Sequence, residues 1–273
     1  PVARRRLRHT SVVSGAVIYN DIHETLGRNH YQAHPSMSDE ELEASDVMRV
    51  GDVLSNREEY QEADEWIGSV INQLELSRPY SIREFLHLMG RELSEIAHED
   101  GILTSAFKSR IPVFCPDLPG SEIGIGIARA KFDKKIQISL DTSQDVLEMM
   151  QIAQRTRNSG IITLGSSGSQ GMINVAEIAS YITRTNPRGH KYAISIATDT
   201  APLDIRTPTY GANHTSMFGK LLRGAITAYV PCDPAIALPM IITALSQTAA
   251  KFMKGRKRPS FSFSGRDMNI DVP

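Results

Sequence analysis

Lys220 is the residue of this sequence whose surroundings best suit an amine nucleophile. It stands in NHTSMFGKLLRGAITAYV, residues 213–230, directly after Phe218 and Gly219 and directly before Leu221 and Leu222. A lysine attacks as the neutral amine, and apolar surroundings favour that form because desolvation lowers the pKa of an ammonium group. Apolar neighbours equally suit a structural lysine whose alkyl stem covers apolar surface. Lys220 is therefore a candidate nucleophile, with a structural role as the alternative.

The segment that leads to Lys220 carries a candidate base. The strand pattern YAISIATD ends at Asp199, and a long polar loop with Asp204 and His214 follows. Long ordered loops are often functional, and a histidine near an amine can act as a general base. The alternative for His214 is a solvent-facing polar side chain.

A turn rich in glycine and serine follows another apolar strand pattern, GIITLG, at residues 160–165. Gly165, Ser166 and Ser167 open this turn, and a helical pattern begins at Met172. Glycines let the backbone approach a phosphate, and a helix N-terminus offers free N–H groups. The spacing is neither GxGxxG nor a P-loop, so nucleotide binding stands beside a plain turn as the alternative.

Two further strand ends carry candidate binding residues. The stretch SVVSGA ends in the small residues Gly15 and Ala16, and Asp233 follows AYVPC directly. An acidic residue at a strand end can hold the hydroxyl pair of a ribose. Asp233 could equally cap the helix that begins at Pro234.

Apolar strand patterns alternate with helical patterns over the second half of the chain. This alternation predicts an α/β fold with a Rossmann-like, doubly wound, mostly parallel sheet and helices on both faces. Strands are expected at 10–19 (broken at Gly15), 111–115, 135–140, 160–165, 192–199 and 224–232, and helices at 20–27, 38–46, 56–76, 81–97, 141–160, 172–185 and 233–253. Residues 31–50 otherwise look irregular, and the acids of 38–65 look like solvated helix faces.

Composition limits the classes of function. The chain has 273 residues and a formal net charge of -1, so nothing points to nucleic acid or a membrane surface. Its two cysteines form no CxxC and no HExxH or EF-hand motif is present, so no metal site or disulfide is expected and a reducing, cytoplasmic location is the default. We expect a single domain over 1–273, with 254–273 as a loosely held polar and basic tail.

Taken together, these segments resemble the deoxyhypusine synthase family and its bacterial deoxyhypusine synthase-like relatives. The matching stretches include SGAVIYNDIHETLGRNHYQAHP, IPVFCPDLPGSEIG, GIITLGSSGSQ and YVPCDPAIALP, and FGK at 218–220 falls where the family has Trp-Gly-Lys. The resemblance covers residues 12 to 250 and implies that an early part of the family's NAD domain is absent here.

The resemblance implies an NAD-dependent aminobutyl transfer from spermidine or a related polyamine, through an imine on Lys220. The acceptor would be a lysine of the hypusine-containing translation factor, or a small amine as in homospermidine-forming relatives. The family is usually a tetramer, so a homotetramer, or a hetero-oligomer with a paralogue, is implied. The resemblance matches Lys220 to the nucleophile, Phe218 to the aromatic wall beside it, and Gly15, Ala16, Gly165, Ser166, Ser167, Asp204 and Asp233 to NAD-contacting positions. The residue patterns add His214 as a catalytic candidate, Asp199 at a strand end as a cofactor candidate, and the loop acids Asp117 and Glu122 as substrate candidates.

Several positions depart from the family pattern. His214 replaces a glutamate that faces a substrate ammonium, Ile125 replaces an acidic contact, and Gly171 with Met172 stand where a histidine is expected. A polyamine cation wants carboxylates, and fewer remain. A non-catalytic NAD-binding paralogue that completes a hetero-oligomer is therefore an alternative function, and an unrelated NAD-binding α/β protein is a further one.

Overall fold

The computed structural model describes residues 10–34, 36–156, 158–165, 172–173, 189–198, 221–255 and 258–272. The chain is divided into two compact units, one of residues 13–141 and one of residues 1–12 with 142–273. Each unit is described by itself below. Compactness does not establish independent folding, which defines a domain, so the single-domain prediction stays a prediction.

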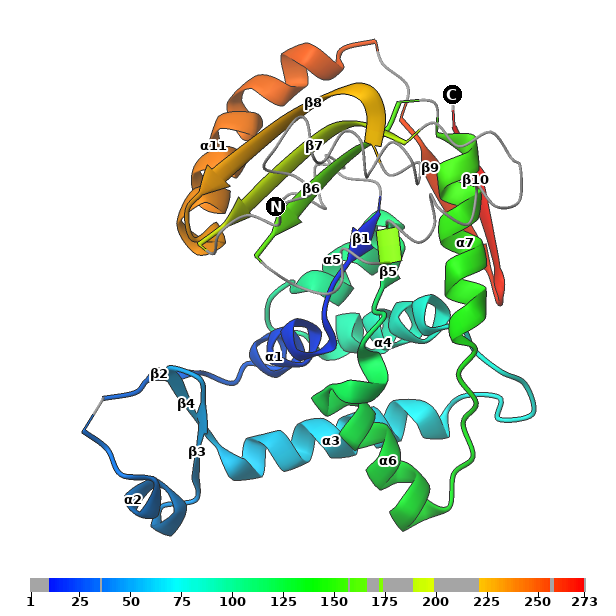
Figure 1. Ribbon diagram of the computed structural model, residues 1–273. Helices are drawn as coiled ribbons and strands as arrows, with labels where there is room; N and C mark the ends of the chain where they lie inside the picture. The colour runs from blue at the N-terminus through cyan, green and yellow to red at the C-terminus, as the bar shows by residue number, and fades with distance from the viewer. Residues whose placement is uncertain are drawn as a thin grey trace. The chain divides into compact units, whose positions relative to one another are not determined.

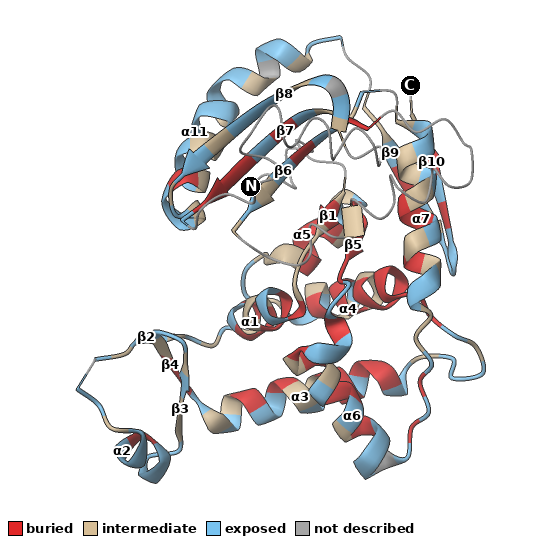
Figure 2. Ribbon diagram, in the orientation of Figure 1, coloured by how far each residue is buried: buried red, intermediate tan, exposed pale blue. Residues whose placement is uncertain are grey.

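Helices dominate unit 13–141 (Figure 1). They are α1 (Gly15–Thr25), α2 (Asp39–Ala44), α3 (Arg57–Asn72), α4 (Ile82–Ile96), α5 (Ile102–Ser109), the 3-10 turn η1 (Leu118–Gly120) and α6 (Glu122–Lys134). Figure 2 shows that α4 is buried along much of its length, with Phe85, Met89 and Leu93 in the core. The spacing predicted for α3 is confirmed, because Tyr60, Ala63, Ile67 and Ile71 are all buried.

The start of α1 differs from the sequence prediction. A strand was expected over 10–19, but the extended part, β1, is limited to Ser11–Val12, and the helix begins at Gly15. Asn20 and Asp21, the expected caps, lie inside the helix, and Ser14 takes the cap position. Asp21 instead accepts a hydrogen bond from the Ile102 N–H at the start of α5, so a long-range contact uses the carboxylate.

The predicted capping box at Ser81 and Glu84 is half present. The Ser81 hydroxyl accepts a hydrogen bond from the Glu84 N–H at 3.0 Å, as expected. The Glu84 carboxylate pairs with Arg78 instead, at 2.8 and 3.1 Å. A complete box forms at Ser38 and Glu41, where it starts α2 inside the expected range of 38–46.

A small antiparallel sheet in the region expected to be irregular was missed. β2 (Tyr31–Gln32), β3 (Val47–Val50) and β4 (Val53–Asn56) are arranged in the order β2–β4–β3. Val50 pairs with Val53 across a two-residue turn in which Gly51 has φ +65°. A Gly-Asp pair between two apolar runs is a hairpin signal, so the stretch VMRVGDVLSN could have predicted the β3–β4 hairpin.

The strand predicted at 135–140 is wrong, whereas the one predicted at 111–115 is reduced to β5 (Val113–Phe114). Ile136 and Ile138 are buried, as their alternation indicated. No ladder forms, and only Leu140 bridges to Tyr80. Alternating burial thus arises here without strand pairing.

The second unit contains a parallel sheet. β6 (Gly160–Leu164), β7 (His190–Ala197) and β8 (Leu221–Pro231) are hydrogen-bonded in this order, with Ile162 opposite Ile194 and Ile194 opposite Ala228. Two helices of this unit are α7 (Thr142–Arg155) and α11 (Pro234–Met253), as the sequence predicted. The mixed α/β character and the parallel strands are confirmed.

The loosely held tail is a wrong prediction. β9 (Ser260–Ser264) and β10 (Asp267–Asp271) form an antiparallel hairpin. Phe261, Met268 and Ile270 are buried together and pack against Ile152 of α7. In SFSFS–GR–DMNID, apolar and polar residues alternate on both sides of a turn at Gly265, whose φ is +54°. This alternation is a hairpin signal, and it was missed because the basic residues that precede it suggested a loosely held tail.

Ile270→Ala tests the hairpin. Removing a buried aliphatic side chain should lower the free energy of unfolding by about 2–4 kcal/mol. The measurement is urea denaturation followed by circular dichroism. Asn269→Ala, at an exposed neighbour in β10, is the matched control and should change little. Equal stability of the two variants would contradict a packed hairpin.

Candidate functional site

The carboxyl-terminal edge of the parallel sheet carries Gly165. This residue follows β6, its N–H donates to the Ile196 carbonyl at 2.9 Å, and its φ is +75°. Among the residues that the structure describes, a Cβ at this position would meet no atom within 4 Å apart from its chain neighbours. The geometry suits close approach of a ligand, while the cofactor role of Gly165 stays a prediction.

Asp233 lies after β8 at the same edge. Its Oδ1 accepts a hydrogen bond from the Ala235 N–H at 2.8 Å, which caps α11 one residue before Pro234. The capping alternative is therefore confirmed, and the ribose role stays a prediction. The end of β7 is fixed nearby, because the Cys232 N–H and the Tyr229 hydroxyl both donate to the Ala197 carbonyl.

Seven of the predicted site residues lie outside the described residues. They are both catalytic candidates, Lys220 and His214, together with Phe218, Asp199, Asp204, Ser166 and Ser167. Leu221, which follows Lys220 in the chain, pairs with His190 at the amino-terminal edge of the sheet, opposite the edge of Gly165 and Asp233. His190 was not singled out from the sequence. It is buried, its Nδ1 lies 2.8 Å from the Ser159 hydroxyl, and burial lowers the pKa of its imidazole to about 4.

In unit 13–141 the N-terminus of α1 brings two predicted site residues together. The Gly15 N–H donates to Asp117 Oδ1 at 3.1 Å, and the Cys115 thiol donates to the same oxygen at 3.3 Å. Ser14 makes no side-chain cap, so Asp117 supplies the anion that a helix N-terminus favours. Ala16, also expected at the cofactor, is exposed on the next position. Asp117 therefore has a structural role that the sequence did not indicate.

Gly15 is required by close packing. A Cβ on it would lie 2.2 Å from Ser121 Oγ and 2.4 Å from Ser121 Cβ. Ser121 is held because its hydroxyl donates to the Leu118 carbonyl at 2.7 Å. The N-terminus of α1 can approach Asp117 only because residue 15 has no side chain.

Glu122, predicted to contact substrate, begins α6 directly after Ser121. Its Oε2 is buried and has no hydrogen-bond partner among the described residues. Burial raises the pKa of Tyr19, Tyr60 and Asp64, and the charge of Glu122 contributes to each increase. Asp64 was expected on a solvated face, but it is largely buried, with its side chain 17% exposed.

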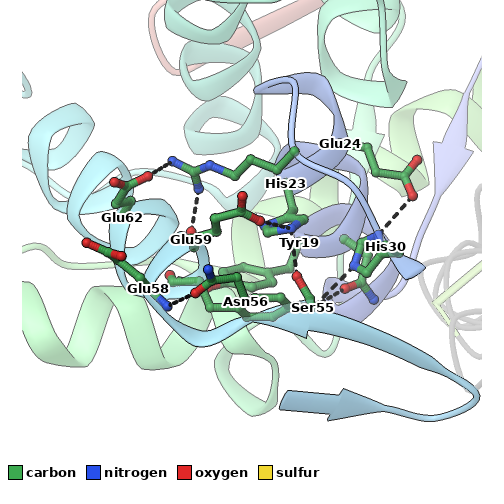
Figure 3. Close-up of polar contacts among 12 residues, drawn as sticks. Tyr19, His23, Glu24, His30, Ser55, Asn56, Glu58, Glu59 and Glu62 are labelled. Atoms are coloured by element: carbon green, nitrogen blue, oxygen red, sulfur yellow. Dashed lines mark hydrogen bonds and ion pairs between the residues drawn. The ribbon is translucent and has the colours of Figure 1, made fainter. Parts of the chain in front are cut away.

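Helices α1 and α3 and strand β4 contribute to a cluster of aromatic and polar side chains (Figure 3). His23 is fully buried, and its Nε2 lies 3.0 Å from the Ser55 hydroxyl and 3.5 Å from Glu59 Oε2. Its ring packs on Tyr60 and on His30, whose Nδ1 lies 2.9 Å from Glu24 Oε1. Ser55 and Glu59 approach the same ring nitrogen, so the group does not have the relay geometry of a catalytic triad. The cluster fixes α1 against α3.

No group of three or more metal-ligating side chains occurs within the part of the chain that the structure describes. In the same residues, no helix combines the length and the apolar composition that crossing a membrane requires.

The chain is similar to known proteins over most of its length. A model of the family described as deoxyhypusine synthase matches residues 2–245. A protein named probable deoxyhypusine synthase 2 from Methanosarcina mazei is 32% identical over 272 residues, covering 96% of this chain and 75% of its own length. A deoxyhypusine synthase-like protein from Coxiella burnetii is 29% identical over 189 residues, covering 68% of this chain and 53% of its own length.

The chain belongs to the deoxyhypusine synthase family. A crystal structure of a putative deoxyhypusine synthase from Entamoeba histolytica has the same fold, with a TM-score of 0.56 at 15% identity, covering 91% of this chain and 68% of that chain. The predicted resemblance is thus confirmed, and membership of this family indicates a transferase.

Gly15→Ala should disturb the N-terminus of α1. The added methyl group must displace Ser121, so the free energy of unfolding should fall by about 1–3 kcal/mol. Gly120→Ala, where a Cβ meets nothing within 4 Å, is the control and should be neutral within about 0.5 kcal/mol. Urea denaturation of both variants measures the difference. Equal midpoints would show that Ser121 leaves room for a side chain at residue 15.

His23 should make stability depend on pH. Burial, followed by the charges of His30 and Arg28, lowers its pKa to about 4 in the folded chain, against about 6.5 when unfolded. The unfolded state therefore binds more protons between these values, and stability present above pH 6.5 is lost as the pH falls toward 4.

The destabilisation caused by His23→Gln should consequently be larger at pH 7 than at pH 4.5. Denaturation midpoints at both values measure it, with the exposed His34→Gln as control. A destabilisation independent of pH would show that His23 is not held neutral.

Proposed function

We propose that the protein transfers an aminobutyl group from spermidine or a related polyamine to an acceptor amine in an NAD-dependent reaction. The observation that carries the proposal is the family match over residues 2–245, which includes FGK at 218–220. We further propose the doubly wound, Rossmann-like arrangement, which is consistent with the parallel order β6–β7–β8.

The described residues are compatible with NAD. Gly165 has positive φ and no described residue within reach of an added Cβ, and it lies at the carboxyl edge of a parallel sheet, where dinucleotides bind in such folds. Asp233 lies at the same edge and keeps an oxygen beyond the one that caps α11. When bound, NAD supplies a hydride acceptor and later returns the hydride.

The remaining chemistry falls to side chains of the chain itself. In the proposal, neutral Lys220 attacks the oxidised carbon of the donor, the donor's amine leaves, and an imine joins the four-carbon unit to Lys220. His214 accepts the proton that Lys220 releases. The acceptor amine then displaces Lys220, and Phe218 provides an aromatic wall for the alkyl chain.

Two acceptors are compatible with the family. A lysine of the hypusine-containing translation factor would fit the names of the archaeal relatives, and a small amine would fit a divergent bacterial type. We further propose a cytoplasmic homotetramer, with a paralogue as the alternative subunit partner.

A non-catalytic, NAD-binding subunit is the second candidate function. It is favoured by His214 in place of a glutamate and by Gly171 and Met172 in place of a histidine. The engagement of Asp117 with the Gly15 N–H also makes one predicted substrate contact partly structural.

Reductive trapping distinguishes these candidates. The protein is incubated with NAD and spermidine, or with NAD and putrescine, and borohydride is added. We expect an aminobutyl adduct on Lys220 by intact mass and peptide mapping, and none in Lys220→Arg. Lys131→Arg, at an exposed lysine of α6, is the control and should keep the adduct. No adduct in a protein shown to bind NAD would favour the non-catalytic subunit.

A further inference from the structure

Strand β8 forms one edge of the parallel sheet, and neither the family match nor the proposed reaction gives that edge a role. The sheet has the order β6–β7–β8, so β7 pairs with only one side of β8 (Figure 1). Successive residues of a strand direct their N–H and C=O groups to alternate sides. Within the described part of the chain no strand pairs with the outer side of β8, so every second residue there lacks a ladder partner.

The regular part of this edge has none of the features that protect natural edge strands. Gly224 has φ +80°, and the register with β7 becomes regular at Ile226, opposite Tyr192. From Ile226 to Val230 the sequence is ITAYV, which contains no charged residue, no proline and no bulge. Lysine, proline and bulges are the features that hinder pairing of an edge with another chain. This edge is therefore suited to accept a further strand.

The side chains of this segment are accessible as well. Ile226 is 65% exposed and Val230 is 36% exposed, and Thr227 and Ala228 between them are also exposed. Side chains alternate between the two faces of a sheet. One face of the segment is thus apolar, with Ile226, Ala228 and Val230, and the other carries the hydroxyl groups of Thr227 and Tyr229.

The segment is complementary to itself. In an antiparallel pair of two copies centred on Ala228, Ile226 lies opposite Val230 and Thr227 lies opposite Tyr229. Apolar side chains then meet on one face, hydroxyl-bearing side chains meet on the other, and the two alanines face each other at the two-fold axis. No like charges are brought together, because the segment has none. A peptide of another protein would find no charged side chain here to select it, whereas a second copy always supplies the matching strand.

We infer that two copies of the chain associate through β8, by antiparallel pairing of residues 226–230 about Ala228. The pairing joins two three-stranded sheets into one continuous sheet. Ile236 and Met240, in the first two turns of α11 after β8, are 62% and 69% exposed, so apolar surface close in the chain to this contact is available too. The inference rests on the strand and not on the proposed reaction, and it names the surface for one contact of the proposed homotetramer.

Charges placed at the two-fold axis test the pairing. Ala228→Lys and Ala228→Glu each bring two like charges face to face at an exposed position, so each variant should sediment at half the mass of the wild type. An equimolar mixture of the two variants places opposite charges face to face and should restore the wild-type mass. Gln247→Lys, at an exposed position of α11, is the matched control and should leave the mass unchanged.

Disulfide trapping tests the register directly. Opposed residues of antiparallel strands have Cα atoms about 4.5–5.5 Å apart, which is a separation that a disulfide spans. The background variant is Cys232→Ser, which leaves the buried Cys115 as the remaining cysteine. In this background, Ala228→Cys should form an intermolecular disulfide on mild oxidation, whereas Gln247→Cys should not.

Three results would overturn the inference. They are a monomeric wild type, an unchanged mass in the Ala228 variants, and a mixture of the two variants that does not regain the wild-type mass. The last result would indicate a different occupant of the edge, such as a peptide of another protein. Neither measurement uses NAD or an amine, so their outcome is independent of the adduct on Lys220 that tests the transfer reaction.

Discussion

The arrangement of unit 13–141 depends on the close approach at Gly15. Asp117, from a segment 102 residues away, reaches the first N–H of α1, and Ser121 occupies the space that a side chain on residue 15 would need. Because η1 and α6 follow Asp117 directly, this contact also sets where Glu122 begins its helix. The hydrogen bond from Gly15 to Asp117 and the absence of a side chain on Gly15 therefore help to determine where both Tyr19 of α1 and Glu122 of α6 lie.

The same contact affects which ligands the N-terminus of α1 can accept. A helix N-terminus attracts anions, and here a carboxylate of the protein satisfies it. A cofactor phosphate at the same N-terminus would meet Asp117 as a like charge. Gly165 lies in the other unit, at a sheet edge.

Local patterns were sufficient for the elements whose periodicity is long and regular. The apolar positions of α3, the strands β6 to β8 and the proline that starts α11 could all be predicted from the sequence. The start of α1 could not, because SVVSGAVIY is as apolar as a strand and the residue that accepts from the Gly15 N–H, Asp117, is distant in the sequence. The residue types at Glu122 and Asp117 indicated a site, but the inward position of Asp64 could not be predicted. Its neighbours Glu62 and Glu65 are exposed, whereas Asp64 is largely buried because α1 and α6 pack against it.

The hairpin β9–β10 bears on how the boundary of this protein should be defined. The family model ends at residue 245, inside α11, whereas Phe261, Met268 and Ile270 complete a hydrophobic cluster with Ile152 of α7. A segment that ended at residue 245 would therefore expose the apolar residue Ile152 of α7, and exposed apolar surface promotes aggregation. The family match alone would place a boundary inside α11, whereas the packing of β9 and β10 on α7 requires that an expressed segment extend at least as far as Val272.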